Sequence, residues 1–102
     1  MIQHIVLLKL RPDHDADELQ QVMAGLAALD LPGFEGFSHG PNRDFENKTP
    51  EYPYGFIGSF ADAGALATYA ADPAHQALGA RLVALCTGGA EGILVADLDT
   101  GT

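Results

Sequence analysis

The pattern of this chain predicts an α+β fold of the ferredoxin-like type, with an antiparallel four-stranded sheet and helices on one face. The first observation is four short runs with strand-like apolar alternation. The second is apolar residues at helical spacing after the first run and before the fourth. The third is that no repeat, low-complexity tract or linker divides the chain, so residues 1–102 are expected to form one domain.

The first strand is expected at residues 2–10, and both of its faces are largely apolar, as in a strand at the centre of a sheet. His4 shares a face with Val6, and this face is assigned to the helices. The opposite face carries Ile5 and Leu7, which a monomer would leave exposed. We therefore expect a two-fold homodimer in which a second copy covers that face. A register error of one residue would exchange the two faces.

Turn residues and helix caps bound the other elements. Asp15 with Glu18 three residues later resembles a capping box at the start of the first helix. Prolines and asparagines mark residues 40–51 as an exposed loop. The other expected strands are 34–39, 54–60 and 93–98; the helices begin at Asp15, Asp62 and Pro73, the first ends at Pro32-Gly33 and the third at Gly88-Gly89.

Composition and charge exclude several classes of partner. Five basic against fourteen acidic residues give a net charge of −9, and the cations are scattered, so neither nucleic acid nor an anionic membrane is expected as a partner. A hydrophobic content of 47% is enough for a core, and the single cysteine, Cys86, is expected to be buried. Residues 1–9 lack a secretory signal and no apolar run is long enough for a membrane span, which predicts a cytoplasmic protein.

The segment from Asp72 to His75 carries the most specific chemical signal. Asp72 is a good helix N-cap, and Pro73 is favoured at the first helical position. His75 then falls in the first turn, where unpaired backbone N–H groups and the helix dipole disfavour a positive ring. A histidine in that place stays neutral near pH 7, as a proton acceptor must. The structural interpretation, in which His75 only seals the cap, stays open.

Three segments resemble the stress-responsive dimeric α+β barrel (Dabb) family, namely residues 4–10, 66–75 and 93–98. The segments occur in the family's order and span about the whole chain. The resemblance implies a homodimer whose two sheets close into a barrel, with a cavity between the sheet and the helices of each subunit.

Within that family, His4, Tyr69 and His75 match three positions of the olivetolic acid cyclase-type polyketide cyclases. This similarity implies an acid/base centre of two histidines assisted by a tyrosine. The chain departs from the pattern at Asp72, where many relatives have histidine, and it has no histidine on its third strand. Structural interpretations also stay open: Tyr69 as a core ring with its hydroxyl at the rim, and His4 as a core histidine bonded to a neighbour.

The same residues predict the chemistry that an enzyme of this kind would perform. A neutral His75 removes a proton beside a carbonyl, Tyr69 donates to the developing enolate oxygen, and His4 orients His75 or shuttles the proton. No metal-ligand spacing appears, no cofactor is expected, and His14 and His39 are given no catalytic role. An apolar wall for a small hydrophobic molecule is predicted from Phe56, Phe60, Leu66, Leu78 and Leu82.

Three functions remain open at this level, and whether the chain is an enzyme is one of the open points. The first is a small cofactor-free enzyme, cyclase- or isomerase-like, that acts on a hydrophobic or carbonyl-containing molecule. The second is a non-enzymatic stress-protective or ligand-binding dimer. The third is a monooxygenase or haem-handling protein of the dimeric barrel superfamily.

Overall fold

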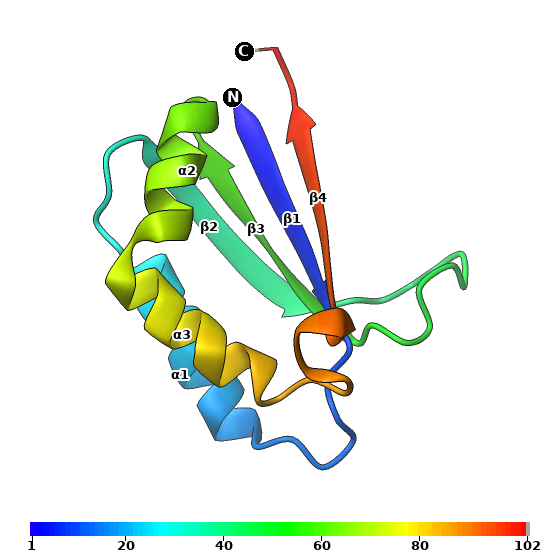
Figure 1. Cartoon of the computed structure of the whole chain (residues 1–102). Coiled ribbons are helices and arrows are strands. Elements are labelled where there is room, and N and C mark those ends of the chain that lie inside the picture. The colour runs from blue at the N-terminus through cyan, green and yellow to red at the C-terminus, as the bar shows by residue number, and fades with distance from the viewer. Residues whose placement is uncertain (102) are drawn as a thin grey trace.

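Four antiparallel strands form one sheet in the order β2-β3-β1-β4 (Figure 1). The computed structural model describes residues 1–101. As predicted, the first and third strands are the central pair of a ferredoxin-like sheet. The strands are β1 (Ile2–Leu8), β2 (Phe34–Pro41), β3 (Tyr54–Phe60) and β4 (Ile93–Asp99).

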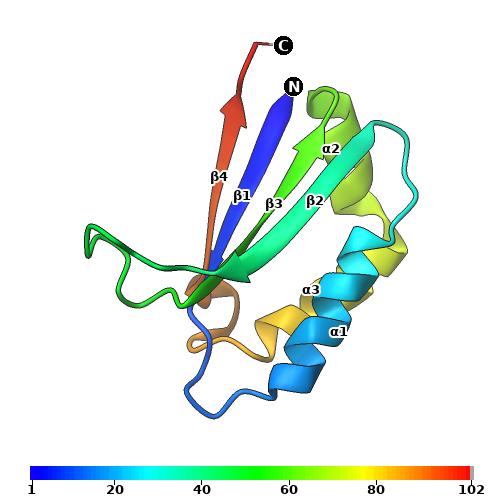
Figure 2. The same ribbon diagram turned by 180° about the vertical axis from the view of Figure 1, so that it is seen from behind.

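The helices lie on one side of the sheet and leave the other side bare, as the two opposite views show (Figures 1 and 2). Within residues 1–101, no helix is long and apolar enough to cross a membrane. The helices are α1 (Ala16–Ala27), α2 (Ala63–Ala71), α3 (Pro73–Val83) and the short 3₁₀-helix η1 (Gly89–Gly92).

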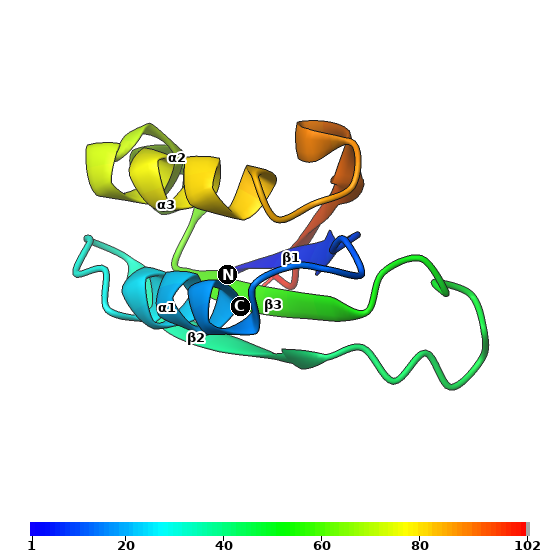
Figure 3. The ribbon, with the colours of Figure 1, turned by 90° about the horizontal axis from the view of Figure 1, so that it is seen from below.

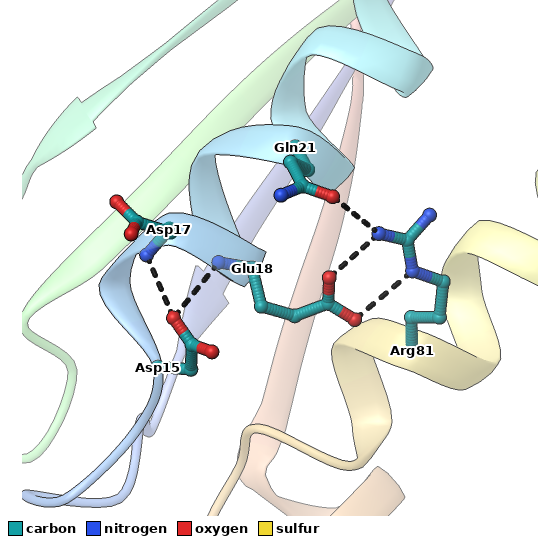
Figure 4. A network of polar contacts seen from close by, with 5 residues as sticks. All are labelled: Asp15, Asp17, Glu18, Gln21 and Arg81. Carbon is teal, nitrogen blue, oxygen red and sulfur yellow. Dashed lines mark hydrogen bonds and ion pairs between the residues drawn. The ribbon is translucent and has the colours of Figure 1, made fainter.

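The predicted cap of α1 forms only in part. The Asp15 side chain accepts hydrogen bonds from the backbone N–H groups of Asp17 and Glu18, which makes it the N-cap. The Glu18 carboxylate accepts two hydrogen bonds from Arg81 on α3, at 3.0 and 2.6 Å, and Arg81 also donates to Gln21 (Figure 4). A bidentate charged partner on another helix therefore takes the place of the reciprocal capping bond.

The core lies between the helices and the helix-facing side of the sheet. Val6 and Leu8 of β1 are buried there with the apolar stripe of α1, so the predicted facing of the first strand is confirmed. The β1 register sets His4 opposite Gly58 on β3 and opposite Asp97 on β4. Because directly paired residues share a face, His4 and Asp97 both lie on the helix side.

The first helix ends at Ala27, before the predicted stop at Pro32-Gly33. The differences at β1 and before β4 involve contacts between distant segments. The first strand ends at Leu8 rather than at Leu10, because Leu10 pairs only in an isolated bridge with Cys86. The α3 helix ends at Val83, and η1, which the sequence did not predict, fills part of the turn before β4. The buried position predicted for Cys86 is confirmed, since its residue is 3% exposed.

The bare face of the sheet is apolar over its central strands. It carries Ile5 and Leu7 of β1, which are partly buried, and Ile57 of β3, which is 40% exposed. Leu94 and Leu98 of β4 continue this surface and are 47% and 54% exposed. A hollow of about 270 Å³ lies between β1, β3 and the end of β2, lined in part by Ile5, Leu7 and Ile57. We call this surface the bare face.

Candidate functional site

The structure brings His4, Tyr69 and His75 together on the helix side of the sheet. The Tyr69 and His75 ring centroids lie 3.9 Å apart, and the His4 centroid lies 6.0 Å from that of Tyr69. The three residues come from β1, α2 and α3, so the site forms only when both helices pack on the sheet. We call these three residues the ring cluster.

The junction between α2 and α3 explains the contact between Tyr69 and His75. Asp72 ends α2, with its backbone N–H donating to the carbonyl of Tyr69, and it also begins α3. Its side chain accepts a 2.9 Å hydrogen bond from the His75 backbone N–H, and Pro73 occupies the first turn of α3, as predicted. One residue thus caps two helices and sets Tyr69 and His75 on either side of a sharp turn.

The environment of His75 favours its neutral form. Burial lowers the pKa of its ring, and the charge of a protonated His4 would lower it further, while the Ala70 backbone carbonyl and the Asp72 carboxylate oppose this shift. Within residues 1–101, Nδ1 of His75 is the one buried side-chain nitrogen or oxygen without a hydrogen-bond partner. A neutral ring with an unused nitrogen is able to accept a proton.

Tyr69 is a buried ring whose hydroxyl has no hydrogen-bond partner among the described residues. The residue is 2% exposed, and burial raises the pKa of the hydroxyl to about 12. Phe60 and Phe34 hold the ring, with centroids 4.8 and 5.4 Å away. The hydroxyl therefore stays protonated at neutral pH and remains able to donate to a ligand.

Asp97 joins the site although the sequence did not single it out. Its Oδ1 lies 2.6 Å from Nδ1 of His4, and the His4 side chain is 16% exposed against 43% for Asp97. A carboxylate at this distance fixes the orientation of the imidazole ring. The expected fold could have pointed to it, because an antiparallel pairing of β4 with β1 sets an acidic residue of the last strand beside His4.

The predicted apolar wall is packed around the ring cluster. Phe56, Phe60 and Leu82 are buried in the core, and Leu66 and Leu78 are partly buried against it. The His4 ring contacts both phenylalanines, at centroid distances of 6.4 and 6.2 Å. Phe56 also contributes to the lining of the hollow on the bare face, whereas the other four side chains line none of the three hollows described on residues 1–101. The role of the five apolar side chains in binding a ligand stays a prediction.

The other two histidines lie apart from the ring cluster. Nδ1 of His14 lies 2.7 Å from the Arg11 carbonyl in the turn before α1. Nδ1 of His39 lies 2.6 Å from the Tyr54 hydroxyl oxygen, which also accepts a 3.3 Å hydrogen bond from Gln20. Among residues 1–101, no three His, Cys, Asp or Glu side chains gather where a metal ion could bind.

The chain matches a known protein family over nearly its whole length. The family model of the stress-responsive A/B barrel domain (Dabb) matches residues 2–99 of the sequence. The chain belongs to the Dabb family. No curated protein matches the chain.

Solved structures extend the comparison. A dimeric ferredoxin-like protein of unknown function from Jannaschia sp. CCS1 is 48% identical, with 97% of this chain and 98% of that one covered and a TM-score of 0.91. Protein At3g17210 of Arabidopsis thaliana is 21% identical, with 100% and 97% covered and a TM-score of 0.84. A hydroxynitrile lyase of Passiflora edulis is 15% identical, with 99% and 94% covered and a TM-score of 0.79. These last two likenesses concern the fold alone.

Proposed function

We propose that this Dabb protein is a homodimer that binds a small hydrophobic, carbonyl-containing molecule and catalyses proton transfer on it without a cofactor. The observation that carries the proposal is the contact between the rings of His75, which is neutral and has a buried unpartnered Nδ1, and Tyr69, whose hydroxyl makes no hydrogen bond with the described residues. An acceptor and a donor side by side are the two groups that enolisation requires.

The proposed step is balanced within the ring cluster. A C–H bond beside the substrate carbonyl breaks and its proton passes to a ring nitrogen of His75. The electron pair moves into the carbonyl, and the enolate oxygen accepts a hydrogen bond from the Tyr69 hydroxyl. His4, oriented by Asp97 at 2.6 Å, returns or relays a proton at a second atom. The net reaction is an isomerisation or ring closure in which no electrons are gained or lost.

Hydrogen–deuterium exchange tests this step without knowledge of the final product. The protein is incubated in D₂O with a panel of small aromatic and aliphatic ketones, and exchange beside each carbonyl is followed by NMR. His75→Ala is expected to lower the exchange rate by about 10²- to 10⁴-fold, and Tyr69→Phe to lower it less. His39→Ala is the matched control, because this histidine lies outside the ring cluster and should leave the rate unchanged.

Two outcomes would contradict the enzyme assignment in different ways. Equal exchange rates in the parent protein and in His75→Ala would remove His75 as the base. Saturable binding of a ketone with no exchange above buffer would favour the ligand-binding dimer instead. Size-exclusion profiles of the variants check that each still assembles as the parent protein does.

The homodimer is proposed through the bare face. Its apolar central residues have no cover within one chain, and the 48% identical Jannaschia protein is described as dimeric. Sedimentation at micromolar concentration should give a dimer, and Leu98→Glu should give a monomer, because a charge would be buried without a partner. Leu7→Glu should split the dimer or prevent folding. Ala24→Glu, on the exposed side of α1, is the control.

A further inference from the structure

Phe45 is the most exposed large apolar side chain among residues 1–101. It is 87% exposed, whereas the other exposed large apolar residues lie between 40% and 54%. It lies in the β2–β3 loop, residues 42–53, with the Arg43 guanidinium 5.5 Å from its ring centroid. We call this loop the arm. Because Phe45 is so exposed, its ring buries little surface in the fold of its own chain.

The arm is held in one shape by hydrogen bonds of its own. Oδ1 of Asp44 accepts bonds from the backbone N–H groups of Lys48 and Thr49 and from the Thr49 hydroxyl, each at 2.9 Å. The Asn42 amide donates to the Thr49 hydroxyl and to the Tyr52 carbonyl, both at 2.8 Å. The entropy of ordering the arm is therefore already lost before any partner binds.

The arm extends on the same side of the sheet as the bare face. Seen from below, the helices lie on one side of the sheet and the β2–β3 loop extends on the other (Figure 3), and the view from behind agrees (Figure 2). The hollow on the bare face is lined by Ile5 and Leu7 and also by Pro41 and Asn42 at the base of the arm. The arm thus continues the surface through which the homodimer is proposed to form.

Charge favours a second copy of this chain as the partner. The arm carries Arg43 and Lys48, two of the five basic residues in a chain of net charge −9, together with Asp44, Glu46 and Glu51. The Glu51 carboxylate lies 3.1 Å from Nζ of Lys9. The Asp44 carboxylate is occupied by the hydrogen bonds inside the arm, which lower its pKa. The tip of the arm presents the Phe45 ring with the Arg43 guanidinium beside it, next to the exposed Glu46. A ring paired with a guanidinium suits an acidic, partly apolar surface.

We propose that in the homodimer each arm reaches over the edge of the shared interface and packs Phe45 against the partner protomer. This inference rests on the proposed homodimer and adds an anchor to it. Full burial of a phenylalanine side chain corresponds to about a tenfold to hundredfold change in an equilibrium constant. A two-fold dimer contains two such anchors, one from each protomer.

Two variants of the full chain test the arm. Phe45→Ala should raise the dimer dissociation constant by about tenfold or more, measured by sedimentation equilibrium, while Glu46→Ala, its exposed neighbour, should leave it unchanged. The chain has no tryptophan, so Phe45→Trp is a single fluorescent reporter. Its emission should be protected from acrylamide in the dimer and lose that protection on dilution to the monomer. Ala77→Trp, on the exposed side of α3, should be quenched equally in both states.

The outcomes separate the arm from the dimer itself. A parent protein that sediments as a monomer would overturn the homodimer and the arm together. The arm proposal alone would be overturned if the parent protein is a dimer and the tryptophan of Phe45→Trp is still fully quenched by acrylamide in its dimer. An unchanged dissociation constant in Phe45→Ala would have the same consequence. Protection of the tryptophan in Phe45→Trp, together with a higher dissociation constant in Phe45→Ala, would support both the homodimer and the packing of the arm.

Discussion

A single oxygen atom distinguishes Tyr69 from phenylalanine, and the structure indicates that the fold does not need it. The hydroxyl makes no hydrogen bond with the described residues, although the residue is 2% exposed. Tyr54 offers a matched comparison, because its hydroxyl oxygen lies 2.6 Å from Nδ1 of His39 and accepts a bond from Gln20 at 3.3 Å. Replacing each tyrosine by phenylalanine removes a hydroxyl that has hydrogen-bond partners at position 54 and one that has none among the described residues at position 69.

The magnitudes follow from the partners that each hydroxyl has. A typical hydrogen bond contributes about 0.5–1.5 kcal/mol net, so Tyr54→Phe should lower the free energy of unfolding by about 1 kcal/mol. Tyr69→Phe loses no bond and removes a poorly solvated polar group, so its free energy of unfolding should stay equal or rise by up to about 1 kcal/mol. A change of 1 kcal/mol shifts the melting temperature of a domain this size by about 4–8 °C.

Urea unfolding followed by far-UV circular dichroism measures both variants beside the parent protein. Protein concentration is held fixed, because dimerisation would make the apparent stability concentration-dependent. Loss of more than about 1 kcal/mol in Tyr69→Phe would refute the reasoning, since it would mean that the hydroxyl supports the fold. Retained stability with lower exchange activity would identify the hydroxyl as a group kept for a ligand.

Two further predictions concern the pH dependence of the unfolding free energy and the room for a Cβ atom at two glycines. Because burial lowers the folded-state pKa of His75 below 6.5, the unfolded chain binds more protons there, and stability should fall as the pH drops below that value. The slope is at most about 1.4 kcal/mol per pH unit, less for a partly exposed ring, and urea unfolding of His75→Gln should lack this component. Gly79→Ala should raise the unfolding free energy by up to about 1 kcal/mol, because its Cβ meets nothing within 4 Å in α3. Gly92→Ala should lower it by about 1–3 kcal/mol, since a Cβ would lie 2.2 Å from the Thr87 carbonyl oxygen; thermal unfolding compares the two.

The sequence was sufficient where local signals decide the structure. Asp72 and Pro73 specify a helix start by themselves, and the structure has that cap with the His75 backbone N–H as donor. The two-residue period of the first strand likewise placed His4 on the face of Val6 and Leu8, and the assignment of that face to the helices is confirmed by their burial. Local patterns placed each member of the ring cluster on its element, and the resemblance to the polyketide cyclases is what singled out the three residues together.

Contacts between distant segments were beyond such signals. Glu18 has the spacing of a capping box, yet Arg81, which lies on another helix, binds its carboxylate. Nothing near Asp97 in the sequence marks it as the partner of His4, since that pairing depends on the register of β4 against β1. The end of the first strand depends in the same way on Leu10 meeting Cys86.

The distribution of unmet hydrogen bonds supports a functional origin for the ring cluster. Elsewhere the chain pairs polar groups closely: the Ser59 hydroxyl donates to Gln3 at 2.8 Å, and Asp44 accepts three bonds in the arm. At the α2–α3 junction, His75 and Tyr69 instead leave an acceptor and a donor unused, on two rings whose centroids lie 3.9 Å apart. An unpaired buried polar group costs free energy in the folded state. His75 Nδ1 is such a group, and it lies on a ring in contact with that of Tyr69, whose hydroxyl is free to give a hydrogen bond. An acceptor and a donor kept unused on adjacent rings are what a site must keep if its missing partner is a ligand.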